Sequence, residues 1–335
     1  MVELLGLVLI AFVVTAFLIV PFIDFLFFLK RKYEKHTIAY KFGSETPIHD
    51  KLMKDDEATP SGGGVLLIAV LTVLTVVYAY FVPLIDLKSL VIPLFTLLSF
   101  GALGFVDDVK WLMTKRSGKV QGLKRPTIIF FQTLFAIIAA FMLYSLAGIN
   151  NLYIPGIDNF IIGWWYIPLA AFIIVSFSNA YNISDGLDGL STGLLTVCLF
   201  AFLVLAHSVF NQPLSVFVGV WIGTLIAYLY FNVFPARIYL GDAGSLAFGA
   251  TLAVVGLSTG KIIGLAVICG VYIVILMSSL LQILSKKFLK RKLFPLAPIH
   301  MYFKFIGWEE PKIVARFWLA GAIFAIFGLW LSLLK

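Results

Sequence analysis

The chain has 335 residues, of which 61% are hydrophobic and only 13% are charged, and its mean hydropathy is +1.03. An ordinary soluble domain is about half apolar and a quarter charged, so this sequence lacks the polar residues that a water-exposed surface requires. The composition excludes a soluble globular protein and predicts an all-α integral membrane protein.

Ten apolar segments follow one another along the chain, each close to the roughly 20 residues that a helix needs to cross the hydrocarbon core. We expect each to be a membrane-spanning helix, the fifth and eighth being the shortest. They cover residues 4–29, 64–83, 90–106, 127–147, 165–180, 191–209, 214–233, 245–259, 261–284 and 313–334. No segment has the composition of a separate soluble domain, so residues 1–335 are expected to form one integral-membrane domain.

Lys and Arg are distributed very unevenly between the loops. Of the 25 basic residues, 22 fall on the side that contains loop 30–63, and only Lys88, Lys261 and Lys335 fall on the other. The positive-inside rule makes the basic side cytoplasmic, so both termini are expected outside. The predicted cytoplasmic loops are residues 30–63, 107–126, 181–190, 234–244 and 285–312. The net charge of +8 favours anionic membrane lipid, and these loops lack a pattern for reading nucleic acid.

Two features are interpreted as structural. The outer loop 148–164 places turn residues between aliphatic pairs and is expected to form a small β-hairpin. Cys198 and Cys269 both fall inside predicted spans, so we expect them to be packing residues without a disulfide framework.

Polar side chains gather on the predicted cytoplasmic side at four separate points. They are Asp107 and Asp108 in GFVDDVKW, Asn182, Asp185 and Asp188 in NAYNISDGLDGLSTG, Asn232 and Asp242 in FNVFPARIYLGDAGS, and His300 in PLAPIHMYFKFIGW. A lone interfacial Asp is usually a helix cap, but five on one face of so charge-poor a chain indicate a site. Mg²⁺ prefers oxygen ligands and is commonly held by one or two carboxylates plus substrate phosphates. The cluster predicts a magnesium and phosphate site.

The same motifs, with APIHMYFKFIGWEEPKIVARFW and TPSGGG, resemble those of the phospho-N-acetylmuramoyl-pentapeptide transferases. This family belongs to the polyprenyl-phosphate N-acetylhexosamine-1-phosphate transferase superfamily, and the resemblance runs in order from about residue 49 to residue 330. It implies a ten-helix, usually dimeric enzyme of the bacterial plasma membrane, with its ninth helix bent into the bilayer. The implied reaction is Mg²⁺-dependent, on the cytoplasmic face. UDP-N-acetylmuramoyl-pentapeptide gives its phospho-sugar to undecaprenyl phosphate, forming UMP and lipid I for peptidoglycan synthesis.

The resemblance also implies residue roles. Asp107 matches the residue proposed to deprotonate or orient the lipid phosphate, Asp108 its partner in the metal and phosphate network, and Asp242 the magnesium ligand. Tyr239 stands where the family has an aromatic side chain that stacks on uracil. The implied substrate-binding set is Ser61, Lys110, Lys124, Asn182, Asp185, Gly186, Leu187, Asp188, Asn232, Tyr239 and His300.

The sequence departs from the family at several cationic positions. Met301 and Tyr302 stand where the family has the second and third of three consecutive histidines. Three family lysines are also displaced, leaving Lys110 before Trp111, Lys124 and Arg125 before Ile128, and Lys54 ahead of an acidic run. These changes keep open a sister enzyme that uses UDP-N-acetylglucosamine or a related sugar nucleotide. A second alternative is an ion-coupled transporter, since intramembrane carboxylates can mark ion paths.

Overall fold

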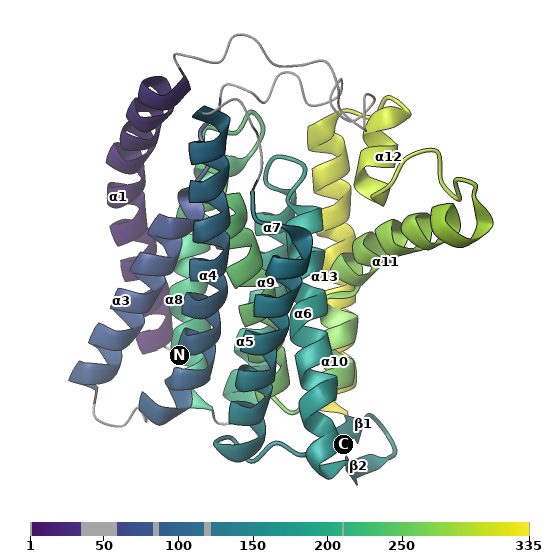
Figure 1. Cartoon of the computed structure of the whole chain (residues 1–335). Helices are drawn as coiled ribbons and strands as arrows, with labels where there is room; N and C mark the ends of the chain where they lie inside the picture. Colours follow the sequence, from purple (N-terminus) through teal and green to yellow (C-terminus); the bar gives the residue numbers. More distant parts are fainter. Residues whose placement is uncertain (1, 35–58, 83–86, 117–121, 210, 335) are drawn as a thin grey trace.

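The computed structural model describes residues 2–34, 59–82, 87–116, 122–209 and 211–334, and its helices form one elongated bundle (Figure 1). The helices are α1 (Val2–Glu34), α3 (Gly63–Phe81), α4 (Leu87–Arg116), α5 (Arg125–Ser145), α6 (Tyr166–Ser184), α7 (Leu190–Ser208), α8 (Gln212–Asn232), α9 (Gly241–Ser258), α10 (Ile262–Ile268), α11 (Gly270–Leu284), α12 (Ile299–Phe305) and α13 (Glu310–Leu333). Within the described residues, ten helical segments are long and apolar enough to cross a membrane. They match the ten predicted spans in order, which confirms the all-α polytopic fold.

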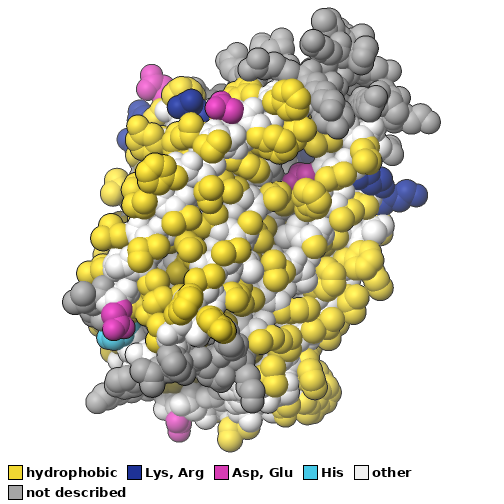
Figure 2. Space-filling model, turned by 90° about the vertical axis from the view of Figure 1, so that its left-hand side faces the viewer, with side chains coloured by type: hydrophobic (Ala, Val, Ile, Leu, Met, Phe, Trp, Pro, Cys, Tyr) yellow, Lys and Arg dark blue, Asp and Glu magenta, His cyan; other side chains and the backbone are white. Residues whose placement is uncertain are grey.

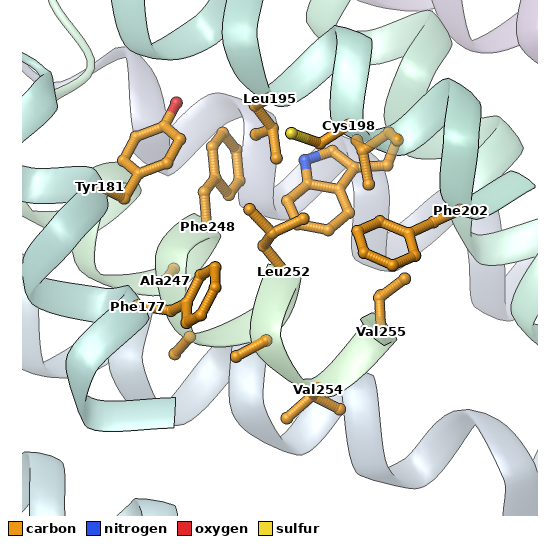
Figure 3. Packing of buried hydrophobic residues seen from close by; sticks show 14 of the residues in the cluster. Phe177, Tyr181, Leu195, Cys198, Phe202, Ala247, Phe248, Leu252, Val254 and Val255 are labelled. Carbon is orange, nitrogen blue, oxygen red and sulfur yellow. The ribbon is translucent and has the colours of Figure 1, made fainter. Parts of the chain in front are cut away.

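Helix α9 forms the centre of the bundle, and residues 243–257 are all buried. Phe248, Leu252 and Val255 of α9 pack among aromatic and aliphatic side chains of α6 and α7, including Tyr181 and Phe202 (Figure 3). The outer surface is also apolar. Hydrophobic side chains cover most of the face seen in Figure 2, as expected of helices whose outer sides meet lipid instead of water.

Glycines let the backbones of neighbouring helices meet at one end of the bundle. A Cβ atom added at Gly104 of α4 would lie 2.1 Å from the carbonyl oxygen of Asp242, and one added at Gly64 of α3 would lie 2.4 Å from Gly244. Residues with side chains at these positions would push α9 away. The glycines therefore bring the acidic ends of α4 and α9 together.

The hairpin predicted in residues 148–164 is confirmed. Strands β1 (Asn151–Ile154) and β2 (Asp158–Ile161) pair antiparallel, with Leu152 opposite Phe160. A 3₁₀ turn, η2 (Gly163–Trp165), then leads into α6. The hairpin and the C-terminus lie at the end of the bundle opposite α12, and the N-terminus lies in the same half (Figure 1). Both termini thus lie toward one end, while their placement outside the membrane stays a prediction. Cys198 and Cys269 are buried free cysteines, as expected of packing residues.

Several helix boundaries differ from the prediction. The sequence predicts a loop over residues 107–126, but α4 continues to Arg116. Asp107 and Asp108 are accommodated within this helix because their carboxylates accept backbone N–H groups of neighbouring segments. The span 261–284 was expected to be one helix, but it breaks at Cys269 into α10 and α11. Gly270 lies directly against the ring of Phe324 of α13 at this break. From there α11 projects away from the bundle (Figure 1).

The predicted loop 285–312 also contains ordered structure. A π-helical turn, η3 (Ser285–Leu289), ends α11, and α12 and the start of α13 follow within the same stretch. In loop 30–63, α1 extends to Glu34 and the chain is described again from residue 59. Lys54 lies outside the described residues.

Candidate active site

A cavity of about 250 Å³ opens at the end of the bundle that carries the acidic motifs. It lies where α6 and α8 end and α7 and α9 begin, beside the segment that precedes α3. Its lining is Ser61, Asn182, Asp185, Gly186, Leu187, Asp188, Asn232, Tyr239, Gly241, Asp242 and Ser245. Nine of these eleven residues are among the candidates that the sequence predicted. The fold therefore brings together candidate residues that are up to 181 positions apart in the chain.

The turn between α6 and α7 forms one wall. Gly189, with a φ of +76°, lets the chain reverse into α7. The hydroxyl of Ser191 donates a hydrogen bond to Asp185, and the Asp188 carboxylate accepts one from the Ala236 N–H at 2.7 Å. Burial raises the pKa of Asp185 to about 6, the Ser191 hydrogen bond opposes this rise, and the nearby Asp188 adds to it. Asp185 can thus carry a proton near neutral pH.

Backbone hydrogen bonds between two segments far apart in the sequence hold the opposite wall of the cavity in place. Ser61 and Tyr239 form a parallel β-bridge, and the Tyr239 carbonyl accepts hydrogen bonds from the N–H groups of Gly62 and Gly63 at 3.1 and 2.9 Å. The Tyr239 N–H donates to Pro60 at 2.9 Å. The TPSGGG motif therefore holds Tyr239 in place through its backbone, which explains why both segments border one cavity.

Three carboxylates converge beside this wall. Asp108 accepts hydrogen bonds from the N–H groups of Asp242 and Ala243 at 3.1 and 3.0 Å, so it binds the N-terminus of α9. Asp107 is buried and accepts a hydrogen bond from the N–H of Leu123, which precedes α5. The side chains of Asp107 and Asp242 lie close enough to interact directly. Helices α4, α5 and α9 thus meet around a concentrated negative charge.

The two asparagines have different surroundings. Asn182 donates from Nδ2 to Asp242 at 2.9 Å and to the Ser245 hydroxyl at 2.7 Å, which orients the Asp242 carboxylate. Asn232 is buried, accepts from the Thr192 hydroxyl at 3.1 Å and donates to the Ile238 carbonyl at 3.0 Å. Asn232 therefore stabilises the loop that follows α8, and its substrate contact stays a prediction.

The remaining candidates lie around the cavity without lining it. His300 of α12 is only 1% exposed, and its Nε2 lies 3.1 Å from where a Cβ atom of Gly186 would be. Lys110 is half-buried near the end of α4, and Lys124 is exposed at the start of α5. Met301 is buried beside His300, in the place where the family carries a second histidine.

The structure adds one residue that the sequence did not single out. Glu310, at the start of α13, is buried and accepts a hydrogen bond from the Asp188 N–H at 2.7 Å. Its other carboxylate oxygen pairs with Lys304 at 2.7 Å. Acidic residues are common in the first turn of helices, so Glu310 does not stand out as a site residue in the sequence. Its position in the GWEEPKIVARFW motif was the only sequence feature that could have indicated a role.

The carboxylates in and beside the cavity wall fit a hard cation that is shared with a ligand. In the described part of the chain, no group of three or more His, Cys, Asp or Glu residues forms a complete metal site. However, Asp107, Asp108 and Asp242 converge without an ion pair to Lys or Arg among these residues. Carboxylate oxygens of this kind could hold Mg²⁺ when substrate phosphates supply the remaining ligands.

Comparison with known proteins gives a consistent result. The family model described as glycosyl transferase family 4 matches residues 90–260. A phospho-N-acetylmuramoyl-pentapeptide-transferase of Bacillus subtilis (strain 168) is 34% identical, over 82% of this chain and 84% of the relative. The proteins of the same name from Borreliella burgdorferi (strain ZS7) and Geobacillus sp. (strain WCH70) are 33% and 31% identical. Those matches span 83% and 97% of this chain and 82% and 96% of the relatives.

The fold and the cavity define a polytopic membrane protein with an acidic site at one end of its helix bundle. The chain belongs to the phospho-N-acetylmuramoyl-pentapeptide transferase family, within glycosyl transferase family 4. It is a phosphotransferase and a multi-pass bacterial membrane protein.

Proposed function

We propose that the protein transfers phospho-N-acetylmuramoyl-pentapeptide from its UDP conjugate to undecaprenyl phosphate, giving UMP and lipid I. The observation that carries this proposal is one cavity at a helix-bundle end that the DGLDG turn and Asp242 line, with Asp107 and Asp108 directly beside Asp242. A lipid phosphate and a soluble nucleotide can meet only near the membrane surface. The cavity end would be cytoplasmic, because the flanking segments carry most of the basic residues.

In this reaction the lipid phosphate displaces UMP at a phosphorus atom of the diphosphate. Catalysis of such a phosphoryl transfer depends mainly on charge neutralisation and alignment of the reactants, and less on a covalent intermediate with the enzyme. Mg²⁺, when bound, would neutralise the pyrophosphate oxygens. Asp242 is the best-placed ligand, since Asn182 and Ser245 orient its side chain. Asp108 would join it through the lone pairs that remain beyond its two N–H contacts, and these contacts also hold α9 in position.

Asp107 would orient the lipid phosphate or accept its proton. Its carboxylate borders Asp242 and is held by the Leu123 N–H, so it lies on the α5 side of the metal position. The nucleotide would occupy the cavity, with Tyr239 along the uracil and the backbone of Gly186 and Leu187 along the diphosphate. This arrangement would place the attacking phosphate and the leaving nucleotide on opposite sides of one carboxylate cluster.

Two membrane properties belong to the same proposal. Undecaprenyl phosphate would reach the site from the bilayer side, where α11 leans away from the bundle and carries exposed apolar residues such as Leu281 and Ile283. The functional unit would be a homodimer in the bacterial plasma membrane, as the family resemblance implies.

The test is turnover by the purified protein in nanodiscs that contain undecaprenyl phosphate, with UDP-N-acetylmuramoyl-pentapeptide and Mg²⁺ supplied. UMP and lipid I are expected from the wild type and neither from Asp107→Asn or Asp242→Asn. Wild-type nanodiscs that release no UMP, or variants with wild-type rates, would contradict the proposal.

Met301 and Tyr302 favour one alternative, a sister enzyme that uses UDP-N-acetylglucosamine, because two family histidines are absent. Comparing UMP release from the two sugar nucleotides separates these functions. A transporter is not favoured, because the chain belongs to a transferase family. The carboxylates that line the cavity, Asp185, Asp188 and Asp242, also lie where helices end or begin instead of at mid-span.

A further inference from the structure

Glu310 lies in the first turn of α13 but is buried, whereas acidic residues at helix starts are usually exposed to solvent. Its side chain is 8% exposed, and both carboxylate oxygens are engaged at 2.7 Å, one with the Asp188 N–H and the other with Lys304 Nζ. Burial of a carboxylate is costly unless it is paired and hydrogen-bonded, and Glu310 meets both conditions. The contact with a main-chain N–H of the cavity wall gives this burial a consequence for the site.

Asp188 also connects the α6–α7 turn to a second loop, the one between α8 and α9. Its N–H is held by Glu310, and its carboxylate accepts the Ala236 N–H at 2.7 Å. Three residues after Ala236, Tyr239 forms the opposite wall of the cavity. A continuous set of hydrogen bonds therefore runs from the start of α13, through the α6–α7 turn, to the loop between α8 and α9.

Helix α13 holds the same turn at a second point. The indole Nε1 of Trp318 donates to the Gly189 carbonyl at 3.2 Å, and its ring lies against Gly193, where an added Cβ atom would come within 2.1 Å. Glu310 and Trp318 thus bind the backbone of neighbouring residues, the N–H of Asp188 and the carbonyl of Gly189. The turn is held in position by α13 as well as by its own helices.

We propose that Glu310 is a positioning residue, which sets the Asp188 peptide and carboxylate so that the DGLDG turn faces the nucleotide. The inference rests on the proposed function and adds a specific determinant of nucleotide affinity. Loss of the acceptor frees the Asp188 N–H and loosens its carboxylate from Ala236. Nucleotide binding then weakens more than the rate of the bound complex falls.

The ion pair with Lys304 could instead serve stability alone, and paired variants separate the two roles. In Glu310→Gln/Lys304→Met, the amide oxygen still accepts the Asp188 N–H. In Glu310→Met/Lys304→Met, the acceptor is gone but the apolar volume remains. Replacing a buried ion pair by apolar side chains is often neutral or stabilising, so both doubles should fold. Glu309→Gln, at the exposed neighbouring position, is the matched control.

The measurements are the dissociation constant for UDP-N-acetylmuramoyl-pentapeptide, the KM and kcat, and hydrogen–deuterium exchange of peptides covering residues 185–190. The Met double is expected to lose about tenfold or more in affinity relative to the Gln double, with faster exchange in this turn and a smaller change in kcat. Equal affinities in the two doubles, within about twofold, would overturn the inference.

If Glu310→Met/Lys304→Met fails to fold, the single variant Lys304→Met tests the positioning role instead. Lys304→Met leaves Glu310 bound to Asp188, so its nucleotide affinity should stay within about twofold of wild type, and a tenfold loss would overturn the positioning role. Failure of the proposed function is distinguishable, because wild-type protein would then neither bind nor turn over this nucleotide. The exchange difference at residues 185–190 would still report the contact.

Discussion

Replacing Asp108 by Asn tests how the N-terminus of α9 is held. The Asp108 carboxylate accepts two backbone N–H groups, from Asp242 at 3.1 Å and Ala243 at 3.0 Å. An Asn side chain keeps one acceptor oxygen, and its NH₂ group points at the second N–H. One charge-assisted hydrogen bond is lost, worth roughly 1.5–3 kcal/mol, and the favourable charge at the helix N-terminus adds about 0.5–1 kcal/mol. The sum is about 2–4 kcal/mol.

Because Asp242 is the first acidic residue of α9, this loss should appear as misplacement of the metal ligand. If it falls entirely on the transition state, turnover decreases by about 30- to 1,000-fold. The assay is UMP release at several Mg²⁺ concentrations, where a higher Mg²⁺ requirement should accompany the lower rate. Asp24→Asn, at an exposed position on α1, is the matched control and should behave as wild type. An Asp108→Asn enzyme within about threefold of wild type, with an unchanged Mg²⁺ requirement, would refute the reasoning.

Three further predictions follow. Gly104→Ala should lower both the melting temperature and turnover, because its methyl group would overlap the Asp242 carbonyl, whereas Gly6→Ala, with open space around it, should change neither. Because the pKa of Asp185 rises on folding to about 6, its protonation stabilises the fold below about pH 4, and that stabilisation is lost as pH rises through 6. The stability of Asp185→Asn, measured by thermal unfolding, should therefore increase relative to wild type between pH 4.5 and 7.5, by up to about 2 kcal/mol, and a constant difference would contradict this. Chelation with EDTA should abolish UMP release, and Mg²⁺ should restore it, while the melting temperature changes little.

Much of the fold was predictable because the membrane imposes simple requirements. Each crossing needs a long apolar helix, and basic residues bias the loops to one side, so ten spans and the acidic end follow from composition alone. The outer hairpin followed from turn residues such as Gly156, which adopts a φ of +75°. Most of the cavity lining also followed, because the motifs that supply it lie where predicted spans end or begin on one side.

The rest depends on contacts between distant segments. Asp107 and Asp108 lie inside α4 and accept N–H groups on the α5 and α9 sides, and no local pattern encodes these partners. The break at Cys269 reflects packing of Gly270 against Phe324, some 54 residues later. Glu310 looks like an ordinary helix-starting acid until the fold places it against Asp188. Sequence patterns predicted which residues gather, and tertiary packing decided how they are held.

The most direct test of the central claim is formation of lipid I in nanodiscs that contain the purified protein, undecaprenyl phosphate, Mg²⁺ and UDP-N-acetylmuramoyl-pentapeptide. The account predicts one UMP released for each lipid I formed, and loss of both products in Asp242→Asn with the fold retained. An Asp242→Asn protein that makes lipid I at the wild-type rate would contradict it.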